Sequence, residues 1–197
     1  IDLFKNVSSE DPKQFQSLLK VVENGIRKMQ NIINELTDTR KQEYKYKAEV
    51  ELINFEHVLE DVRLTITDNI FKSGAVIKSE VNVSEITFSR RKLRSIVYNL
   101  ISNAIKFKSP ERKLEIFIKT KREDNFIIIS VKDNGIGIDA SKQDDIFSKY
   151  FRMENAIEGS GIGLYLVKEI VNNSGGKILL ESQPGKGSEF KVYLKAE

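Results

Sequence analysis

Three polar side chains recur at helical spacing within residues 90–107, which read RRKLRSIVYNLISNAIKF. Asn99, Asn103 and Lys106 are four and three residues apart, so a helix places them on one face. Two carboxamide oxygens and an ammonium group directed at one place suit a hydrated magnesium ion with bound phosphates, because hard cations take oxygen ligands and lysine neutralises phosphate charge. Asparagines at this spacing are also common in caps, in helix–helix hydrogen bonds and on plain surfaces, so the motif alone assigns no site.

A second motif places an acidic side chain directly after an apolar run. Residues 126–139 read FIIISVKDNGIGID, in which Asp133 is followed by Gly135 and Gly137. A carboxylate at a strand end can accept a hydrogen bond from an exocyclic amine such as that of adenine, and the glycines let the backbone approach a flat ring. The simpler interpretation, still open on these residues alone, is a turn after a strand.

A third motif is rich in glycine. Residues 159–171 read GSGIGLYLVKEIV, so Gly159, Gly161 and Gly163 lead directly into an amphipathic helix. Backbone N–H groups at a helix N-terminus that no side chain shields form an anion site suited to phosphate. The glycines do not follow a strand within a βαβ unit, so the dinucleotide-binding and Walker interpretations lack their required context.

Periodicity predicts the elements that position these motifs. Helices and antiparallel strands are interleaved without regular βαβ repetition, which indicates an α+β fold, an α/β sandwich with a mixed sheet covered by helices on one face. The expected helices cover residues 55–71, 89–107 and 163–173. The expected strands cover residues 50–54, 75–80, 114–118 and 126–131, and a closing hairpin pairs residues 178–181 with 190–194 around QPGKGS.

The N-terminal part has a different pattern. Apolar residues from Phe15 to Leu36 recur at spacings of mostly three and four, which predicts a helix with one apolar stripe. We expect residues 1–47 to be the remnant of a helical hairpin that pairs with a second copy, making a homodimer, and the alternative is packing on the following domain only. The second domain is then 48–197. The chain does not begin with methionine, and we expect it to be cut from a longer protein.

Composition excludes several classes of function. The 197 residues include no cysteine and one histidine, His57, which excludes disulfides, zinc–cysteine sites, thiol nucleophiles and two-histidine metal sites. The formal charge is +3, from 32 basic and 29 acidic residues, too balanced for a dedicated nucleic-acid binder. No apolar stretch approaches the roughly 18 residues of a membrane helix, so we expect no membrane contact and a cytoplasmic location. Whether the full-length protein is tethered to a membrane stays open.

Together, the three motifs resemble in order and spacing the ATP-binding domain of sensor histidine kinases. These belong to the superfamily that also holds the gyrase, heat-shock chaperone and mismatch-repair ATPases. NLISNAIKF is similar to the asparagine box, DNGIGI to the first glycine box, IFSKYFR to the phenylalanine box and GSGIGLYLVKEIV to the second glycine box. The resemblance runs from about Ala48 to the C-terminus, and the preceding helix resembles the second helix of the family's dimerisation domain.

The resemblance implies roles for the residues at the two ends of the asparagine box. Asn103 would coordinate Mg²⁺, Asn99 would assist in positioning phosphate or metal during catalysis, and Lys106 would contact phosphate. Phe107 stands where the family usually has tyrosine beside the base, so a stacking surface is kept and a hydroxyl contact is lost. Arg152, at the end of the phenylalanine box, would steady γ-phosphate charge during transfer.

The other boxes supply the remaining expected contacts. Asp133 would read the adenine amine, with Gly135 and Gly137 flanking the ring. The backbone of Gly161, Gly163 and Leu164 would contact the phosphates. Phe147, Tyr150 and Phe151 are expected to serve mainly in packing.

The implied function is that of a protein-histidine kinase that uses Mg-ATP. Asn99 stands where the superfamily's ATPases have a glutamate base, so phosphate is expected on a side chain rather than on water. The family's acceptor histidine lies in a motif absent around His57, so the acceptor is expected upstream of Ile1, and a response regulator receives the phosphate next. This fragment is then not expected to autophosphorylate. The alternatives are a non-catalytic nucleotide-sensing or dimerising scaffold of the same fold, and a protein-serine kinase of the superfamily.

Overall fold

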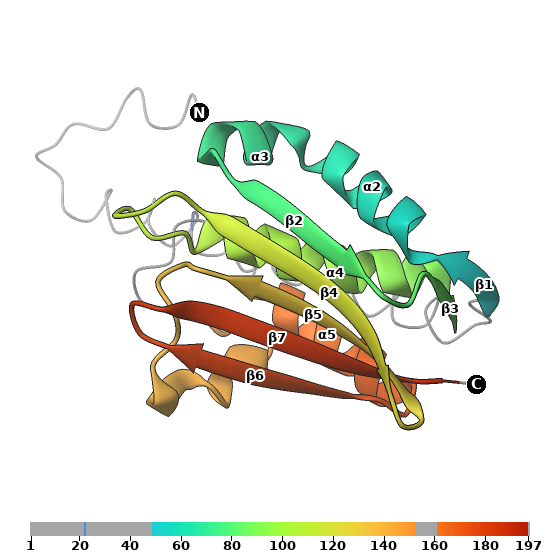
Figure 1. Cartoon of the computed structure of the whole chain (residues 1–197). Helices are drawn as coiled ribbons and strands as arrows, with labels where there is room; N and C mark the ends of the chain where they lie inside the picture. Colours follow the sequence, from blue (N-terminus) through green and yellow to red (C-terminus); the bar gives the residue numbers. More distant parts are fainter. Residues whose placement is uncertain (1–21, 23–48, 153–160, 197) are drawn as a thin grey trace, which may run out of the picture. The chain divides into compact units, whose positions relative to one another are not determined.

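The computed structural model describes residues 22, 49–152 and 161–196, nearly all of them in one compact unit that begins at Glu49 (Figure 1). The expected helical hairpin and the boundary after residue 47 lie outside the described residues. In chain order the elements are β1 (Glu51–Asn54), α2 (Phe55–Thr65), α3 (Thr67–Ser73), β2 (Val76–Val81), β3 (Glu85–Phe88), α4 (Arg90–Lys106), β4 (Glu115–Glu123), β5 (Phe126–Asp133), the short 3₁₀ turns η2 (Ala140–Lys142) and η3 (Asp145–Phe147), α5 (Gly163–Asn173), β6 (Lys177–Gln183) and β7 (Gly187–Lys195).

Five strands form one mixed sheet in the order β2-β4-β5-β7-β6, and β1 pairs with β3 separately. The β2–β4 pair is parallel, and the other pairs of the large sheet are antiparallel. Figure 1 shows α4 and α5 behind the same face of this sheet. The expected α+β fold, with a mixed sheet covered by helices on one face, is therefore confirmed.

The alternation of side chains along the strands creates the two faces of the sheet. In β4, Ile116, Ile118 and Thr120 are buried, whereas Phe117 and Lys119, which alternate with them, are exposed and partly exposed. On this outer face Lys119 pairs with Glu80 at 2.7 Å, and the Lys191 ammonium bonds the Glu181 carboxylate. Such exposed pairs stabilise little, so the fold depends mainly on the inner face.

The helix α4 forms for three local reasons. Ser89 accepts a hydrogen bond from the Lys92 N–H and so caps the first turn. The stripe predicted from the sequence is buried and packs into the core: Leu93, Val97, Leu100 and Ala104. The helix ends at Lys106, where the Phe107 N–H donates to the Asn103 carbonyl. Burial of this stripe fixes the rotation of α4 and with it the direction of the opposite, polar face.

Two local expectations were wrong. The helix expected over 55–71 is divided at Ile66 into α2 and α3. The hydroxyls of Thr65 and Thr67 donate to the carbonyls of Asp61 and Arg63 at 2.7 and 3.0 Å, an alternative to regular helix bonding that these β-branched residues favour. In addition, β3 was not expected as a strand, and it pairs with β1.

Candidate functional site

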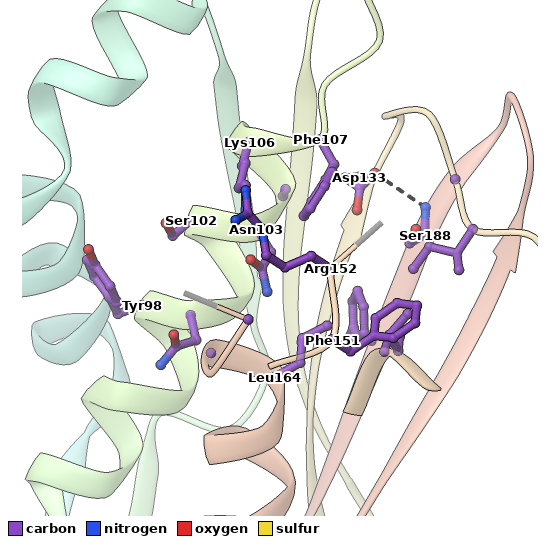
Figure 2. A pocket seen from close by; sticks show the side chains of 18 residues that line it. Tyr98, Ser102, Asn103, Lys106, Phe107, Asp133, Phe151, Arg152, Leu164 and Ser188 are labelled. Atoms are coloured by element: carbon purple, nitrogen blue, oxygen red, sulfur yellow. Dashed lines mark hydrogen bonds between the residues drawn. The ribbon is translucent and has the colours of Figure 1, made fainter. Parts of the chain in front are cut away.

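A pocket of about 360 Å³ opens beside the polar face of α4 (Figure 2). It is bounded by α4, the end of β5, the start of α5 and the start of β7. All of the site residues expected from the sequence line it except Gly135: Asn99, Asn103, Lys106, Phe107, Asp133, Gly137, Arg152, Gly161, Gly163 and Leu164. Residues separated by more than sixty positions in the chain therefore meet around one cavity.

The carboxamides of α4 differ in their local bonds. Asn99 Nδ2 donates to the Ser95 carbonyl at 2.8 Å, which fixes the orientation of the amide. Asn99 Oδ1 then lies toward the start of α5, because a Cβ added at Gly163 would come within 2.7 Å of it. The Asn103 side chain makes no hydrogen bond within residues 49–152 and 161–196, and it lines the pocket. Its carboxamide is therefore available to a ligand.

Positive charge gathers at the same end of the pocket. Lys106 and Arg152 both line it, and Figure 2 shows their side chains near Asn103. Burial lowers the pKa of Lys106, and the nearby Arg152 charge lowers it further. Two cations that disfavour each other's charge in a partly desolvated pocket favour an anion between them. This end of the pocket suits phosphate groups.

Negative charge is provided by Asp133, the one acidic residue among the described residues that line the pocket. Its Oδ1 accepts from the Gly135 N–H at 2.8 Å and from the Ser188 N–H at 3.3 Å. Burial raises the pKa of Asp133, and these two backbone hydrogen bonds oppose that rise. Within the described residues no hydrogen bond reaches Oδ2, which leaves an acceptor for a donor group on a ligand.

The glycines around Asp133 allow close backbone contacts. Gly137 has φ +71°, and a Cβ there would lie 2.0 Å from the Gln183 carbonyl oxygen. At Gly135 a Cβ would lie 2.4 Å from the Phe107 carbonyl oxygen. Gly135 thus contacts the end of α4 and does not line the pocket, in contrast to the expectation that it flanks a ring.

The start of α5 forms another wall. Gly163 opens the helix, and Gly161 before it has φ +69° with the Phe151 carbonyl oxygen 2.7 Å from where a Cβ would be. The Tyr150 N–H donates to the Gly161 carbonyl at 3.0 Å, which joins the segment ending at Arg152 to the start of α5. The first N–H groups of a helix have no partner within the helix, so this N-terminus provides a site for an anion. Gly159 lies outside the described residues.

Sequence reasoning missed part of the lining. Ile138, Ile146 and Phe190 add to the apolar part of the lining, and Tyr98, Ser102, Ala104 and Ser188 also line the pocket. Of the aromatic residues expected to pack, Phe147 contacts the Phe190 ring edge-on at 6.3 Å, and Phe151 both packs on the core and lines the pocket. Ser188 is found by strand alternation, because it points to the same face as Phe190.

The pocket fits a metal ion only together with a ligand. Residues 49–152 and 161–196, with Val22, contain no group of three or more His, Cys, Asp or Glu side chains that would hold one. The oxygens available at the phosphate end come from carboxamides such as that of Asn103. Mg²⁺ commonly takes one or two protein oxygens and completes its shell with water and phosphate. The donor set fits that pattern.

No helix in the described part of the chain has the length and apolar character needed to cross a membrane.

Comparison with known proteins agrees with this geometry. Residues 88–197 match the family described as histidine kinase-, DNA gyrase B-, and HSP90-like ATPase. The chain is 40% identical to the circadian input-output histidine kinase CikA of Synechococcus elongatus over 108 residues. That alignment covers 53% of this chain and 14% of CikA. Over 92% of the chain it is 27% identical to the sensor protein kinase WalK of Staphylococcus haemolyticus, of which it covers 34%. The chain thus spans about a third or less of these relatives.

Solved structures share the fold. The histidine kinase AdeS of Acinetobacter baumannii aligns with a TM-score of 0.71 and 21% identity, over 99% of this chain and 90% of that one. The histidine kinase ThkA, solved in complex with the response regulator protein TrrA, aligns with a TM-score of 0.65 and 20% identity, over 100% of this chain and 55% of that one.

The matched segment begins at Phe88, just before α4, and continues through β5, α5 and the closing hairpin, so it contains every element that lines the pocket. This confirms the resemblance recognised from the sequence: the chain belongs to the histidine kinase-, DNA gyrase B- and HSP90-like ATPase family.

Proposed function

We propose that this chain carries the ATP-binding catalytic domain of a sensor histidine kinase. One observation carries the proposal: the pocket has a partly buried carboxylate, Asp133, on one side and a carboxamide with two cations, Asn103, Lys106 and Arg152, on the other. That arrangement matches a purine with an exocyclic amine joined to a chain of phosphates. Family membership and the sensor-kinase names of the relatives support the same assignment.

At the base end, the free Oδ2 of Asp133 accepts a hydrogen bond from the adenine amine. Phe107, at the end of α4, supplies an apolar ring beside the base, and Gly137 leaves room for it. A hydrogen bond to a partly buried carboxylate is worth more than the same bond in water, because fewer water molecules compete for the donor.

At the phosphate end, Asn103 holds Mg²⁺ together with the phosphates of ATP, and Lys106 neutralises phosphate charge. When bound, the metal ion offsets the charge that develops during phosphoryl transfer. Asn99 orients the phosphates, the N–H groups of Gly161, Gly163 and Leu164 donate to them, and Arg152 contacts the transferring group. Gly135 supports the base end from outside the pocket through its contact with Phe107.

The pocket favours transfer to a side chain over hydrolysis. A carboxamide such as Asn99 cannot act as a general base for water, and Asp133 is at the base end. His57 is exposed in the first turn of α2 and does not line the pocket. We therefore place the acceptor on a helix upstream, with residues 1–47 as part of a dimerising hairpin and 48–197 as the catalytic domain. This fragment alone does not autophosphorylate.

A response regulator is the expected recipient of the phosphate, as the complex of ThkA with TrrA suggests by analogy. Both ATP and such receivers are cytoplasmic, so the domain works in the cytoplasm. The alternative is a nucleotide-sensing scaffold of the same fold, which binds ATP without transferring phosphate.

The first test is titration calorimetry with Mg-ATP and Mg-ADP. We expect Asp133→Asn and Asn103→Ala each to weaken binding about tenfold or more, because an unpaired polar group at a desolvated contact costs about 1–3 kcal/mol. Ser130→Ala is the matched control, since it removes a hydroxyl on the outer face that bonds Glu189 at 2.7 Å. Equal affinity in all four proteins would exclude the assigned site.

A further inference from the structure

The segment that follows Asp133 leaves the sheet and needs other partners for its backbone. We call residues 134–139 the glycine loop. The Ile136 N–H donates to the Phe107 carbonyl at 3.0 Å, and the Gly185 N–H of the β6–β7 turn donates to the Ile136 carbonyl at 2.7 Å. Backbone bonds thus tie the middle of the loop to α4 on one side and to the β6–β7 hairpin on the other.

The end of the glycine loop is tied by side chains instead. The Ile138 N–H donates to Ser182 Oγ at 2.8 Å, and the Ile138 carbonyl accepts from Gln143 Nε2 at 3.1 Å. The same Gln143 nitrogen donates to the Ser182 carbonyl, also at 3.1 Å. Ile138 is almost fully buried and lines the pocket, so both of its backbone polar groups depend on these two side chains.

Hydrogen bonds continue from this clamp, formed by Gln143 and Ser182, to the carboxylate. Ser182 Oγ lies 2.9 Å from both the Gly187 carbonyl and Ser188 Oγ, and Ser182 pairs with Ser188 across the hairpin. The Ser188 N–H in turn donates to Asp133 Oδ1. One hydroxyl therefore connects the glycine loop to the strand that orients Asp133.

We infer that Ser182 and Gln143, neither of which lines the pocket, are positioning residues that set the selectivity of the site for adenine. The inference rests on the proposed function. A hydrogen bond weakens steeply when its angle or distance departs from the optimum, so a small shift of the hairpin against the glycine loop misdirects Asp133 Oδ2. Supporting hydrogen bonds of this kind commonly control how a ligand-contacting group is aimed.

The clamp should act on the base and not on the phosphates. Its partners belong to the glycine loop, β6 and β7, whereas the phosphate end is formed by α4 and the start of α5. Loss of the clamp is therefore expected to change recognition of the exocyclic amine much more than recognition of the triphosphate.

The test compares Mg-ATP with Mg-ITP, whose hypoxanthine ring has an oxygen in place of the amine and carries the same triphosphate. Wild type should prefer ATP. In Ser182→Ala the affinity for ATP should fall about tenfold, as expected for one misdirected polar contact, while that for ITP stays within about twofold. Ser182→Thr keeps a hydroxyl on a strand and should restore the preference. Gln143→Glu, which cannot donate to two carbonyls, should behave like Ser182→Ala.

Ser130→Ala on the outer face is again the control and should keep the wild-type ratio. Partial unfolding would lower the number of binding sites per chain and not the ratio of the two affinities, so calorimetry separates it from a positioning role. An unchanged ATP-to-ITP ratio in folded Ser182→Ala or Gln143→Glu would overturn the inference. Wild type that binds neither nucleotide would instead overturn the proposed function.

Discussion

At the scale of single residues, the role proposed for Asp133 comes with a cost in stability. A carboxylate that is partly buried with an open acceptor is poorly solvated in the absence of ligand, and this desolvation raises its pKa. Sites of this kind are often optimised for binding at the expense of the folded state. The balance can be measured by removing the charge.

Asp133→Asn should stabilise the ligand-free protein increasingly as the pH rises. The folded state of wild type binds the Asp133 proton more tightly than the unfolded state, so its free energy of unfolding falls as pH rises from near the unfolded pKa of about 3.9 to the raised one. Asparagine does not titrate, and its Oδ1 can keep the bonds from Gly135 and Ser188.

Urea unfolding of both proteins between pH 3.5 and 8 tests this, because all other titrating groups are shared. The difference in free energy of unfolding should grow in favour of the variant across that window and then level off. A difference that stays constant with pH would contradict the raised pKa.

Asn103 should matter only when metal and nucleotide are both present. Because the described residues offer no acidic cluster, Mg²⁺ titrated alone should show no saturable binding. In wild type, Mg²⁺ should strengthen ADP binding, and Asn103→Ala should reduce that strengthening about tenfold or more while ADP affinity in EDTA stays nearly unchanged.

Calorimetry of ADP with and without Mg²⁺ measures both quantities. Asn172→Ala, an exposed asparagine of α5 outside the pocket, is the matched control. The metal assignment fails if Asn103→Ala and Asn172→Ala show the same dependence on Mg²⁺.

The sequence alone identifies a site residue only when a local pattern, such as helical spacing or the end of a strand, marks its position. Asn99, Asn103 and Lys106 share a helix face at intervals of four and three, and Asp133 stands at the end of an apolar strand. Local pattern is therefore enough to identify these four residues as candidates. Ser182 and Gln143 are single polar residues in a strand and near a turn. Their role depends on contacts across 39 residues of chain, which no local spacing reports.

At the scale of elements, the glycine loop is limited by its contact with the β6–β7 hairpin. Gly137 and Gly74 have nearly the same φ, +71° and +68°, but a Cβ at Gly137 would lie 2.0 Å from a carbonyl oxygen, whereas one at Gly74 would meet nothing within 4 Å. Alanine at either position costs about 1–2 kcal/mol for the left-handed backbone.

Gly137→Ala should therefore lose more stability than Gly74→Ala, by about a further 1–3 kcal/mol for the overpacked contact. Urea unfolding of the two variants measures the difference, and the shared φ makes Gly74→Ala the control. Equal losses would show that the loop shifts freely away from the hairpin and that the close contact does not limit it.

Elements with long, clear patterns were predictable, and those that depend on partners were not. The strands of the closing hairpin and the helices α4 and α5 agree with their expected positions to within a few residues. The strand β3 has four residues and is stabilised by pairing with β1, and the parallel pairing of β2 with β4 joins segments about forty residues apart. Local periodicity does not report which strands pair, so neither pairing could be predicted from the sequence.

At the scale of the whole molecule, nucleotide binding and phosphate transfer are separable. The elements that line the pocket all lie in the unit that begins at Glu49, so we expect this unit to bind ATP by itself. Transfer needs an acceptor brought to the γ-phosphate, and the only histidine of the chain, His57, is exposed on α2 away from the pocket lining. A kinase and a sensing scaffold therefore differ only when an acceptor helix is supplied.

We expect the present chain to bind ATP with negligible hydrolysis and no stable self-phosphorylation. A longer chain that includes the upstream acceptor helix should become labelled by γ-labelled ATP in an acid-labile, base-stable form, as expected of phosphohistidine. Arg152→Ala should then slow labelling more than it weakens ATP binding, because its contact strengthens as charge develops on the transferring group. His57→Gln is the control and should leave labelling unchanged. Labelling of the present chain that His57→Gln abolishes would overturn the assigned acceptor, and an unlabelled longer chain that still binds ATP would favour the scaffold.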